Sequence, residues 1–321
     1  MDCPFEDEGT HRPKPRLGRL QRLTLSSTCS KPSRTIIRSI ELGACTSVSM
    51  YGGSDLRDPL ILDDIQRSRG SRADQWSKIY LLRTTPRTAP GTSRYVTPRQ
   101  THCIVADPSS GVLCENMNIV VPPGAEWKET ITTSVGPVRL TSSVRIPAQV
   151  DTSLIREAWI IELSNDELGF SSSDLVSLMR RMPALESLTM SDKTFSRFCQ
   201  SLIFAQDTLC PRLSSVHVLL NGRSSSPVSI LRPLTTILRS LPRRMFKVKI
   251  GYLPGFKKER VYATELDAFF DSVEYVSHTE MPHMEMPPVC SADPHSFWPS
   301  WPLPKWKRQL EMWSRFAGEV E

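Results

Sequence analysis

Short apolar triplets recur along the chain with a fixed spacing. The clearest copy lies in the segment PRLSSVHVLLN, where Leu213, Val216 and Val218 follow the spacing L-x-x-L-x-L and Asn221 comes shortly after. Val216 and Val218 alternate on a short predicted strand, so both side chains point into one core. Asn221 stands where the chain leaves this strand, and its amide can satisfy backbone groups there. One copy arises easily by chance, whereas recurrence of the spacing along the chain indicates a repeat.

The same spacing returns in both halves of the chain. Neighbouring copies begin about 25–32 residues apart, close to the ~20–29 residues of a leucine-rich repeat. The apolar positions of these copies are Leu20, Leu23 and Leu25; Cys45, Val48 and Met50; Trp76, Ile79 and Leu81; Ala158, Ile161 and Leu163; Leu185, Leu188 and Met190; Met245, Val248 and Ile250; and Val273 with Val276.

The stretches between these strands have helical periodicity. Ser173 or Asp174 can cap a helix that is apolar on one face. Further helices are predicted from Thr194, from Ser226 or Pro227, and from Thr264. Pro183, Pro211 and Pro242 stand just before strand positions, where they end a helix and set the register of the next strand. We therefore predict an α/β fold, an irregular leucine-rich-repeat-like solenoid of short parallel strands and helices. Another α/β fold is the alternative, although no nucleotide-binding glycine motif is present.

Two regions do not fit the repeat. Residues 84–150 are rich in Thr, Val and Ile and are predicted to be β-rich, as irregular repeats or as an insertion, with a hairpin turn at Gly136–Pro137. Residues 281–321 hold four of the seven tryptophans and end in a predicted helix, which we expect to cap the solenoid. A docking helix or a membrane-surface helix is the alternative there. The predicted organisation is therefore 1–83, N-terminal repeats; 84–150, β-rich; 151–280, regular repeats; and 281–321, tail.

Composition and charge exclude several classes of protein. No stretch approaches the ~18 apolar residues of a membrane span, and the first residues have no apolar core typical of a secretory signal. The eight cysteines form no C-x-x-C pair, which favours reduced thiols and a cytoplasmic or nuclear location. The net charge of +6 comes from two loose basic runs, 12–38 and 239–260. We expect these runs to be solvated surface rather than a nucleic-acid site, because no reader motif accompanies them.

No catalytic motif is present. The sequence lacks H-E-x-x-H, G-x-S-x-G and the kinase motifs. Potential metal ligands concentrate in residues 278–295, but their spacing is irregular and prolines intervene, so a solvent-exposed loop is favoured over a zinc site. Asp166 and Glu167 follow a predicted strand and are expected to be ordinary loop residues. We therefore expect no enzyme activity, no cofactor and no metal.

Three phrases carry a resemblance to a known family. The segments PRLGRLQRLTL, MPALESLTM and LCPRLSSVHVLL resemble the degenerate leucine-rich repeats of fungal F-box-type proteins, over residues 16–81 and 154–280. The resemblance implies a non-enzymatic substrate-recognition module of a cullin-type ubiquitin ligase. The F-box itself is not found, so the linker subunit of the ligase is an expected partner only if an F-box exists upstream.

The leading hypothesis is a non-catalytic repeat module that binds a protein partner. Solenoids bind through an extended concave surface, which the exposed strand positions would line. An enzyme of unrecognised fold and a weak nucleic-acid binder acting through the basic runs are the alternatives. The candidate contact residues are Glu186, Ser187, Thr189, Ser214, Ser215, His217, Lys247 and Lys249.

Overall fold

The structure is a computed structural model of the 321-residue chain. It describes residues 15–17, 20, 22–26, 30–42, 47–51, 64–65, 68, 76–84, 97–106, 111–120, 132–133, 136–137, 152–162, 170, 172–204, 210–221, 229–230, 232, 247–254, 256, 270–282 and 284–285.

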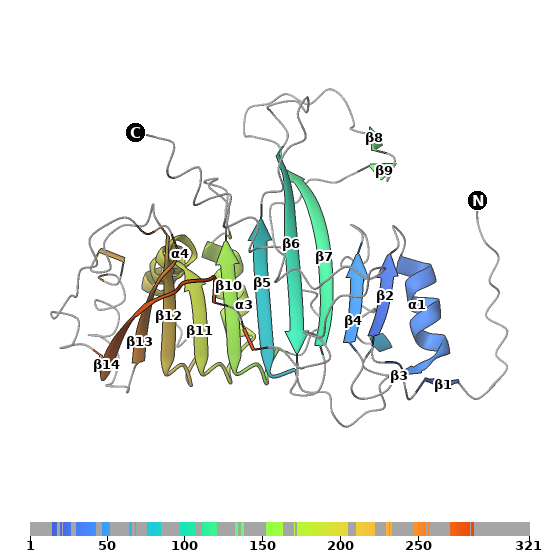
Figure 1. The fold of residues 1–321 in the computed structure, drawn as a ribbon, viewed down its shortest axis with the longest axis horizontal. Helices are drawn as coiled ribbons and strands as arrows, with labels where there is room; N and C mark the ends of the chain where they lie inside the picture. The colour runs from blue at the N-terminus through green and yellow to red at the C-terminus, as the bar shows by residue number, and fades with distance from the viewer. Residues whose placement is uncertain are drawn as a thin grey trace.

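One open sheet organises the described residues (Figure 1). Its strands are β2 (Arg22–Ser26), β4 (Ser47–Tyr51), β5 (Lys78–Thr84), β6 (Thr97–Ala106), β7 (Gly111–Val120), β10 (Glu157–Glu162), β11 (Ser187–Ser191), β12 (Ser215–Leu220), β13 (Lys247–Tyr252) and β14 (Ser272–Ser277). They lie in the order β14-β13-β12-β11-β10-β5-β6-β7-β4-β2. All neighbours are parallel except β5–β6 and β6–β7. The fold is therefore α/β with a mostly parallel sheet.

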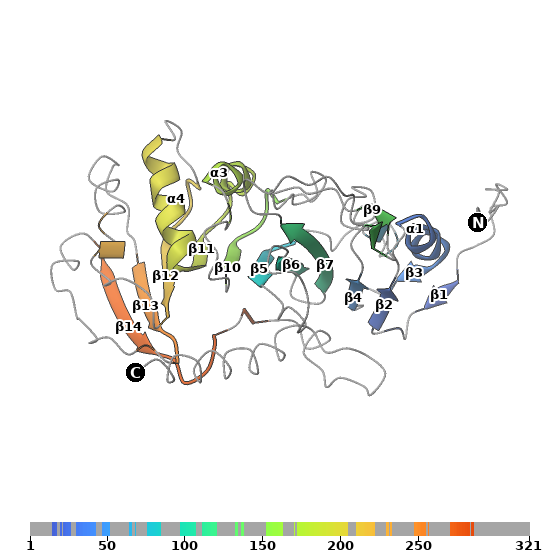
Figure 2. The ribbon, with the colours of Figure 1, turned by 90° about the horizontal axis from the view of Figure 1, so that it is seen from above.

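Helices cover one side of this sheet. They are α1 (Ser30–Ser39), α3 (Ser172–Arg180) and α4 (Asp192–Phe204). Seen from above, the strands follow an arc, with all three helices on its outer side (Figure 2). Two short pairs complete the described elements: β1 (Arg16–Leu17) with β3 (Glu41–Leu42), and β8 (Thr132–Thr133) with β9 (Gly136–Pro137).

The register of the parallel block places equivalent apolar residues side by side under the helices. Leu188 lies beside Val216, and Val216 beside Val248; one step along, Met190 lies beside Val218 and Val218 beside Ile250. All six side chains are buried in the main core. The predicted strands and their inward positions are confirmed for these three copies.

Two copies were placed in the wrong phase. The register pairs Ala158 with Leu188 and Val273 with Val248, and Leu188 and Val248 are the second apolar residues of their copies. Ala158 and Val273 therefore also occupy the second core position of their units, whereas the sequence pattern assigned them to the first. The first positions are instead Ile155 and Phe270, which are both buried in the main core. The error arises because these strands are apolar at adjacent positions, so the spacing fits two phases.

A tight turn precedes three of these strands. The N–H groups of Ile155, Leu185 and Leu213 donate to the carbonyl groups three residues earlier, at 3.2, 3.2 and 3.0 Å. Pro183 and Pro211 occupy the second position of two of these turns, where the fixed φ of proline is favourable. The predicted role of these two prolines at strand entries agrees with this geometry, whereas Pro242 lies outside the described residues.

The predicted helices α3 and α4 are present. Leu175, Met179 and Met182 are buried beneath α3, and Phe195 and Cys199 beneath α4. α4 begins at Asp192, two residues before the predicted start, because β11 ends directly at Ser191. Most of the helix predicted after Pro227 and the C-terminal capping helix lie outside the described residues. So do residues 264–269 of the helix predicted over 264–273, and the prediction is wrong for its last residues, because Ser272 and Val273 belong to β14.

A long antiparallel hairpin interrupts the parallel order. β6 and β7 pair over their whole lengths and stand between β5 and β4. β4 consequently pairs with β7 rather than with β5, the next strand of the main sheet in the chain. Residues 97–106 and 111–120 are extended and lie within the region predicted to be β-rich. Gly136–Pro137 forms strand β9, which pairs with β8, and the prediction of a turn at these two residues is wrong.

Candidate functional site

The inner side of the arc, opposite α3 and α4, carries a row of polar and aromatic residues across six strands. The ring of Trp159 stands 6.2 Å from Tyr80 and meets His217 edge-on at 6.3 Å. At the other end of the row, Lys249 Nζ is 3.6 Å from Glu274 Oε1. We call these residues the inner row: Tyr80, Trp159, Thr189, His217, Lys249 and Glu274.

The strand entries form a second, more exposed line. The N–H groups of Glu186, Ser214 and Lys247 each donate to the carbonyl of the preceding residue in the line, at 2.8, 3.0 and 2.8 Å, beginning with Arg156. Side chains here face solvent: Arg156 is 67% exposed and Glu186 47%, and Ser214 and Lys247 are exposed too. We call Arg156, Glu186, Ser214 and Lys247 the entry rim.

The structure divides the predicted contact residues between these two lines. Glu186, Ser214 and Lys247 lie on the entry rim, and the half-buried Ser187 and Ser215 follow it. His217 and Lys249 belong to the inner row and are half-buried.

Thr189 has the predicted strand position but not the predicted exposure. Its side chain is only 3% exposed, between Trp159 and His217 in the inner row. The prediction of an exposed contact is wrong for this residue. Thr189 is flanked by two larger side chains of the neighbouring strands, and a repeat pattern does not indicate this arrangement.

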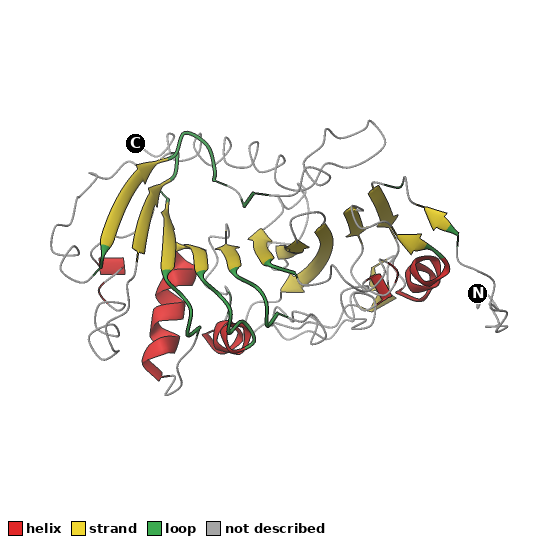
Figure 3. Ribbon diagram, turned by 90° about the horizontal axis from the view of Figure 1, so that it is seen from below, coloured by secondary structure: helices red, strands yellow, loops and turns green. Residues whose placement is uncertain are grey.

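The segment that follows β14 crosses part of the inner side of the sheet. Its described residues, within 278–285, turn back across the inner side of the sheet (Figure 2, Figure 3). The N–H of His278 donates to Tyr252 O at 2.9 Å, and Lys78 Nζ donates to Glu285 O at 3.1 Å. Met284 is completely buried. We call this segment the strap; it joins the two ends of the β5–β14 block.

Two imidazoles meet where the strap begins. The rings of His217 and His278 are 5.6 Å apart, centroid to centroid, over Gly251. An added Cβ at Gly251 would lie 2.7 Å from Nε2 of each histidine, so only glycine permits this approach. Burial, and to a lesser extent the charges of its neighbours, lowers the pKa of His217 to about 3. Burial and Lys249 also lower the pKa of His278. Both rings are therefore neutral at neutral pH.

The buried carboxylate of Glu162 connects the sheet to α4. Glu162 accepts a hydrogen bond from Arg197 at 2.8 Å, and its backbone N–H donates to Ser191 Oγ at 3.2 Å. Ser191 Oγ also shares a 2.9 Å hydrogen bond with Thr194 Oγ1. This network connects the ends of β10 and β11 to the first turns of α4, so its evident role is structural.

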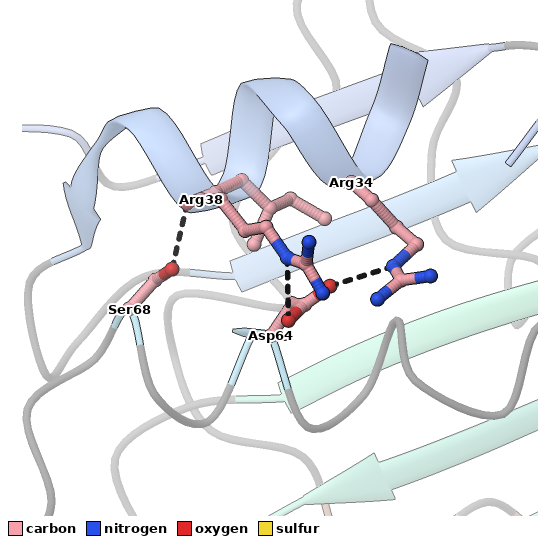
Figure 4. Close-up of polar contacts among 5 residues, drawn as sticks. Arg34, Arg38, Asp64 and Ser68 are labelled. Atoms are coloured by element: carbon pink, nitrogen blue, oxygen red, sulfur yellow. Dashed lines mark hydrogen bonds and ion pairs between the residues drawn. The ribbon is translucent and has the colours of Figure 1, made fainter. Parts of the chain in front are cut away.

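The first basic run contributes to a similar cluster at the other end of the sheet (Figure 4). Asp64, only 2% exposed, accepts hydrogen bonds from Arg34 at 2.8 Å and Arg38 at 2.9 Å, and Ser68 Oγ donates to Ile37 O at 2.6 Å. Burial alone would raise the pKa of Asp64, but the two guanidinium groups outweigh it and lower that pKa. Two arginines predicted to be solvated surface therefore hold Asp64 against α1.

The buried thiols are not arranged for chemistry. Burial raises the pKa of Cys103 and of Cys210 to about 12 and raises that of Cys199 as well, so these thiols stay protonated. Within the described ranges, no group of three or more His, Cys, Asp or Glu side chains could hold a metal ion. Nor is any helix in the described part of the chain long and apolar enough to cross a membrane.

The site that stands out is therefore the inner side of β5 and β10–β14, with its entry rim, inner row and strap. Sequence reasoning identified the strands that form it but missed Trp159, His278 and Gly251. The signal available for His278 was its position in the only concentration of metal-ligand residues in the sequence. Comparison with protein-family models, with curated proteins and with solved structures finds no match to this chain.

Proposed function

We propose that this protein is a non-catalytic binding module, an irregular leucine-rich-repeat-like solenoid that recognises a protein partner through its entry rim. The recurrence of one structural unit supports the proposal most directly. The same turn, with its backbone hydrogen bond, precedes each of three successive strands and ends at Ile155, Leu185 and Leu213. The strands that follow these turns pair in register. Such repetition generates an extended surface with side chains at regular intervals, which is how repeat proteins bind other proteins.

The charges of the entry rim favour a polar partner surface. Arg156, Glu186 and Lys247 alternate in sign along the line. The one ion pair among them is long, at 3.9 Å between Arg156 and Glu186, and both side chains are exposed. Exposed pairs of this kind contribute little to folding, about 0–1 kcal/mol, so their charges are free to engage a partner. Alternating charges of this kind fix the register of binding more than they add affinity.

A photo-crosslinking residue placed on the rim tests the assignment. We expect a crosslinker at Ser214 to form a discrete adduct with a partner in cells, and a crosslinker at Ser177, exposed on the outer helix α3, to form none. The charge reversal Glu186→Lys with Lys247→Glu should abolish the adduct, whereas Arg180→Glu on α3 should not. Equal crosslinking from the two faces, or adducts unaffected by the rim reversal, would contradict the proposal.

The location and the link to a ubiquitin ligase are part of the same proposal. A cytoplasmic or nuclear substrate-recognition role follows from the sequence resemblance, and it requires an F-box elsewhere in the full protein. Co-purification of the natural full-length protein with the linker subunit of a cullin ligase tests this link. If the linker subunit does not co-purify while the rim adducts persist, the binding role stands without ligase coupling.

A further inference from the structure

The strap begins against a pair of imidazoles whose inner nitrogens have no partner. Nε2 of His217 and Nε2 of His278 are buried atoms, and neither has a hydrogen-bond partner among the described residues. Each lies 2.7 Å from the point that a Cβ of Gly251 would occupy, so the two atoms are separated by no more than twice that distance. Buried polar atoms without partners are rare in proteins, and a charge placed on such an atom is costly.

We propose that His217 and His278 form an acid-sensitive latch, which holds the start of the strap on the sheet at neutral pH and releases it as the imidazoles take up protons. A neutral imidazole carries one N–H, whereas the protonated ring carries two and a positive charge. Protonation of either ring would leave a charged donor at Nε2, where the described residues offer no acceptor. Lifting the strap removes this cost, because it returns the ring of His278 to water.

The charged groups around the latch oppose a proton there. From β13, Lys249 acts on both rings, and its positive charge adds to burial in lowering the pKa of each. From β14, Glu274 lies 3.6 Å from the ammonium of Lys249 and forms an ion pair with it. In the strap itself, Glu280 and Glu285 are exposed to solvent. The latch is therefore beside a cation, and the carboxylate next to it is engaged by that cation.

The other neighbours of the latch are uncharged. The ring of His217 meets Trp159 of β10 edge-on at 6.3 Å and lies beside Thr189 of β11 in the register. A methyl group of Leu219 lies 2.9 Å from the Cβ position over Gly251. None of these side chains carries a negative charge that would stabilise an imidazolium.

The direction of the pH effect follows from the two pKa values. Burial, then the charges of His278 and Lys249, lowers the pKa of His217 from 6.5 to about 3. Burial and Lys249 also lower the pKa of His278 from 6.5. An imidazole that a lifted strap exposes has an ordinary pKa of about 6.5. Above this pH the closed strap keeps its full stability. Below it the lifted state takes up protons first, and its population gains up to about tenfold per pH unit for each histidine that it exposes.

Acid acts on one end of the strap only. At the other end, Lys78 Nζ donates to the backbone carbonyl of Glu285 at 3.1 Å, and Met284 is buried. A backbone carbonyl does not titrate, so protonation of the latch loosens the start of the strap selectively. The latch thus makes exposure of this segment dependent on pH, whatever the protein binds elsewhere.

Hydrogen exchange followed by mass spectrometry tests the latch in the full chain. The measured quantity is the protection of backbone N–H groups in peptides from 278–285, relative to an unstructured peptide of the same sequence at the same pH, so that the intrinsic effect of pH cancels. Between about pH 7.5 and about pH 5, this protection should fall several-fold to about thirtyfold for one exposed histidine. Peptides from β12 should keep their protection over the same range.

Three variants identify the groups responsible. His278→Gln places a side chain that does not titrate in the latch and should abolish the acid loss of protection. His283→Gln makes the same change in the same segment but outside the latch, and it should leave the acid loss intact. Lys249→Gln removes the cation that lowers both pKa values, so it should reduce the acid loss without abolishing it.

The same measurements can overturn the latch. It is overturned if acid lowers the protection of the wild-type strap no more than that of β12, if the loss persists unchanged in His278→Gln, or if His283→Gln abolishes it. Should His278→Gln lack strap protection already at neutral pH, Lys249→Gln decides: a smaller acid loss supports the latch, and an unchanged loss overturns it.

Discussion

Replacing Gly251 by alanine gives the sharpest test of how the strap packs on the sheet. In the interior of a strand, glycine is ordinarily less favourable than alanine by about 0.5–1 kcal/mol, so the substitution should stabilise a strand that has open space above it. Here the added methyl group would lie 2.7 Å from Nε2 of both His217 and His278, and 2.9 Å from a methyl group of Leu219. All three approaches are too close for an undistorted structure.

Whether Gly251→Ala stabilises or destabilises the protein therefore depends on the two imidazoles. Inserting a methyl group into a filled site costs about 1–3 kcal/mol, because side chains and backbone must shift. Setting this cost against the gain in strand preference leaves Gly251→Ala destabilising by up to about 2.5 kcal/mol. In the background His217→Ala with His278→Ala, only the flexible end of Leu219 remains in the way, so most of the penalty should disappear.

Urea denaturation in EDTA, followed by circular dichroism, measures the stability of four proteins: the wild type, Gly251→Ala, the double histidine variant, and the double histidine variant with Gly251→Ala. The difference between the two effects of Gly251→Ala is the coupling between the methyl group and the imidazoles, and neighbouring residues commonly couple by about 0.5–3 kcal/mol. A stabilising Gly251→Ala in the wild-type background would show that the imidazoles do not lie over Gly251. An equal penalty in both backgrounds would lead to the same conclusion.

Other predictions concern the core and the ends of the sheet. Phe270→Ala should destabilise the protein by about 3–5 kcal/mol, because Phe270 fills the first core position of its unit. Val276→Ala, on the inner side, should cost less than about 1.5 kcal/mol. Urea midpoints compare the two variants, and equal costs would support the sequence-based assignment of Val276 to the core. Asp64→Asn should cost about 1.5–3 kcal/mol by weakening the bonds to Arg34 and Arg38. Since the pKa of Asp64 is lowered below 3.8 on folding, its stabilisation is present above that pH and is lost as the pH falls below it. Unfolding measured between pH 2.5 and 6 should therefore show a steeper acid decline in the wild type than in Asp64→Asn, and parallel curves would contradict this role.

The core side of the parallel block could be predicted from the sequence because its signal is local. Leu188 with Met190, and Val216 with Val218, alternate within a few residues, and each is preceded by a turn that contains a proline. The sequence pattern assigned Ala158 to the wrong core position, because this strand is buried on both faces and Ile160 and Ile161 are both apolar. A strand buried on both sides reads as a continuous apolar run, so spacing alone cannot tell which residues face the helices.

The rest depends on contacts between distant parts of the chain. Helix α1 lacks an acidic residue in its first turn, and the partner of its arginines, Asp64, lies about one repeat further along. The β6–β7 hairpin, in which Pro98 pairs with Ile119, separates β5 from β4. The strap reaches the far end of the block through a contact between Lys78 and Glu285, which are 207 residues apart in the chain. No local pattern encodes such pairings.

The strap also determines which part of the candidate site a partner can use. A partner that contacts only the entry rim leaves the strap in place. A partner that displaces the strap to reach the inner side exposes Met284, at about 1.5–3 kcal/mol, and breaks the bond from Lys78, at about 0.5–1.5 kcal/mol. Met284→Ala weakens the strap without touching the rim. It should leave the affinity of a rim-bound partner unchanged, and it should increase that of a partner bound to the inner row about tenfold or more. Measuring partner affinity for this one variant therefore separates the two surfaces: an unchanged affinity assigns the partner to the entry rim, and an increase assigns it to the row beneath the strap.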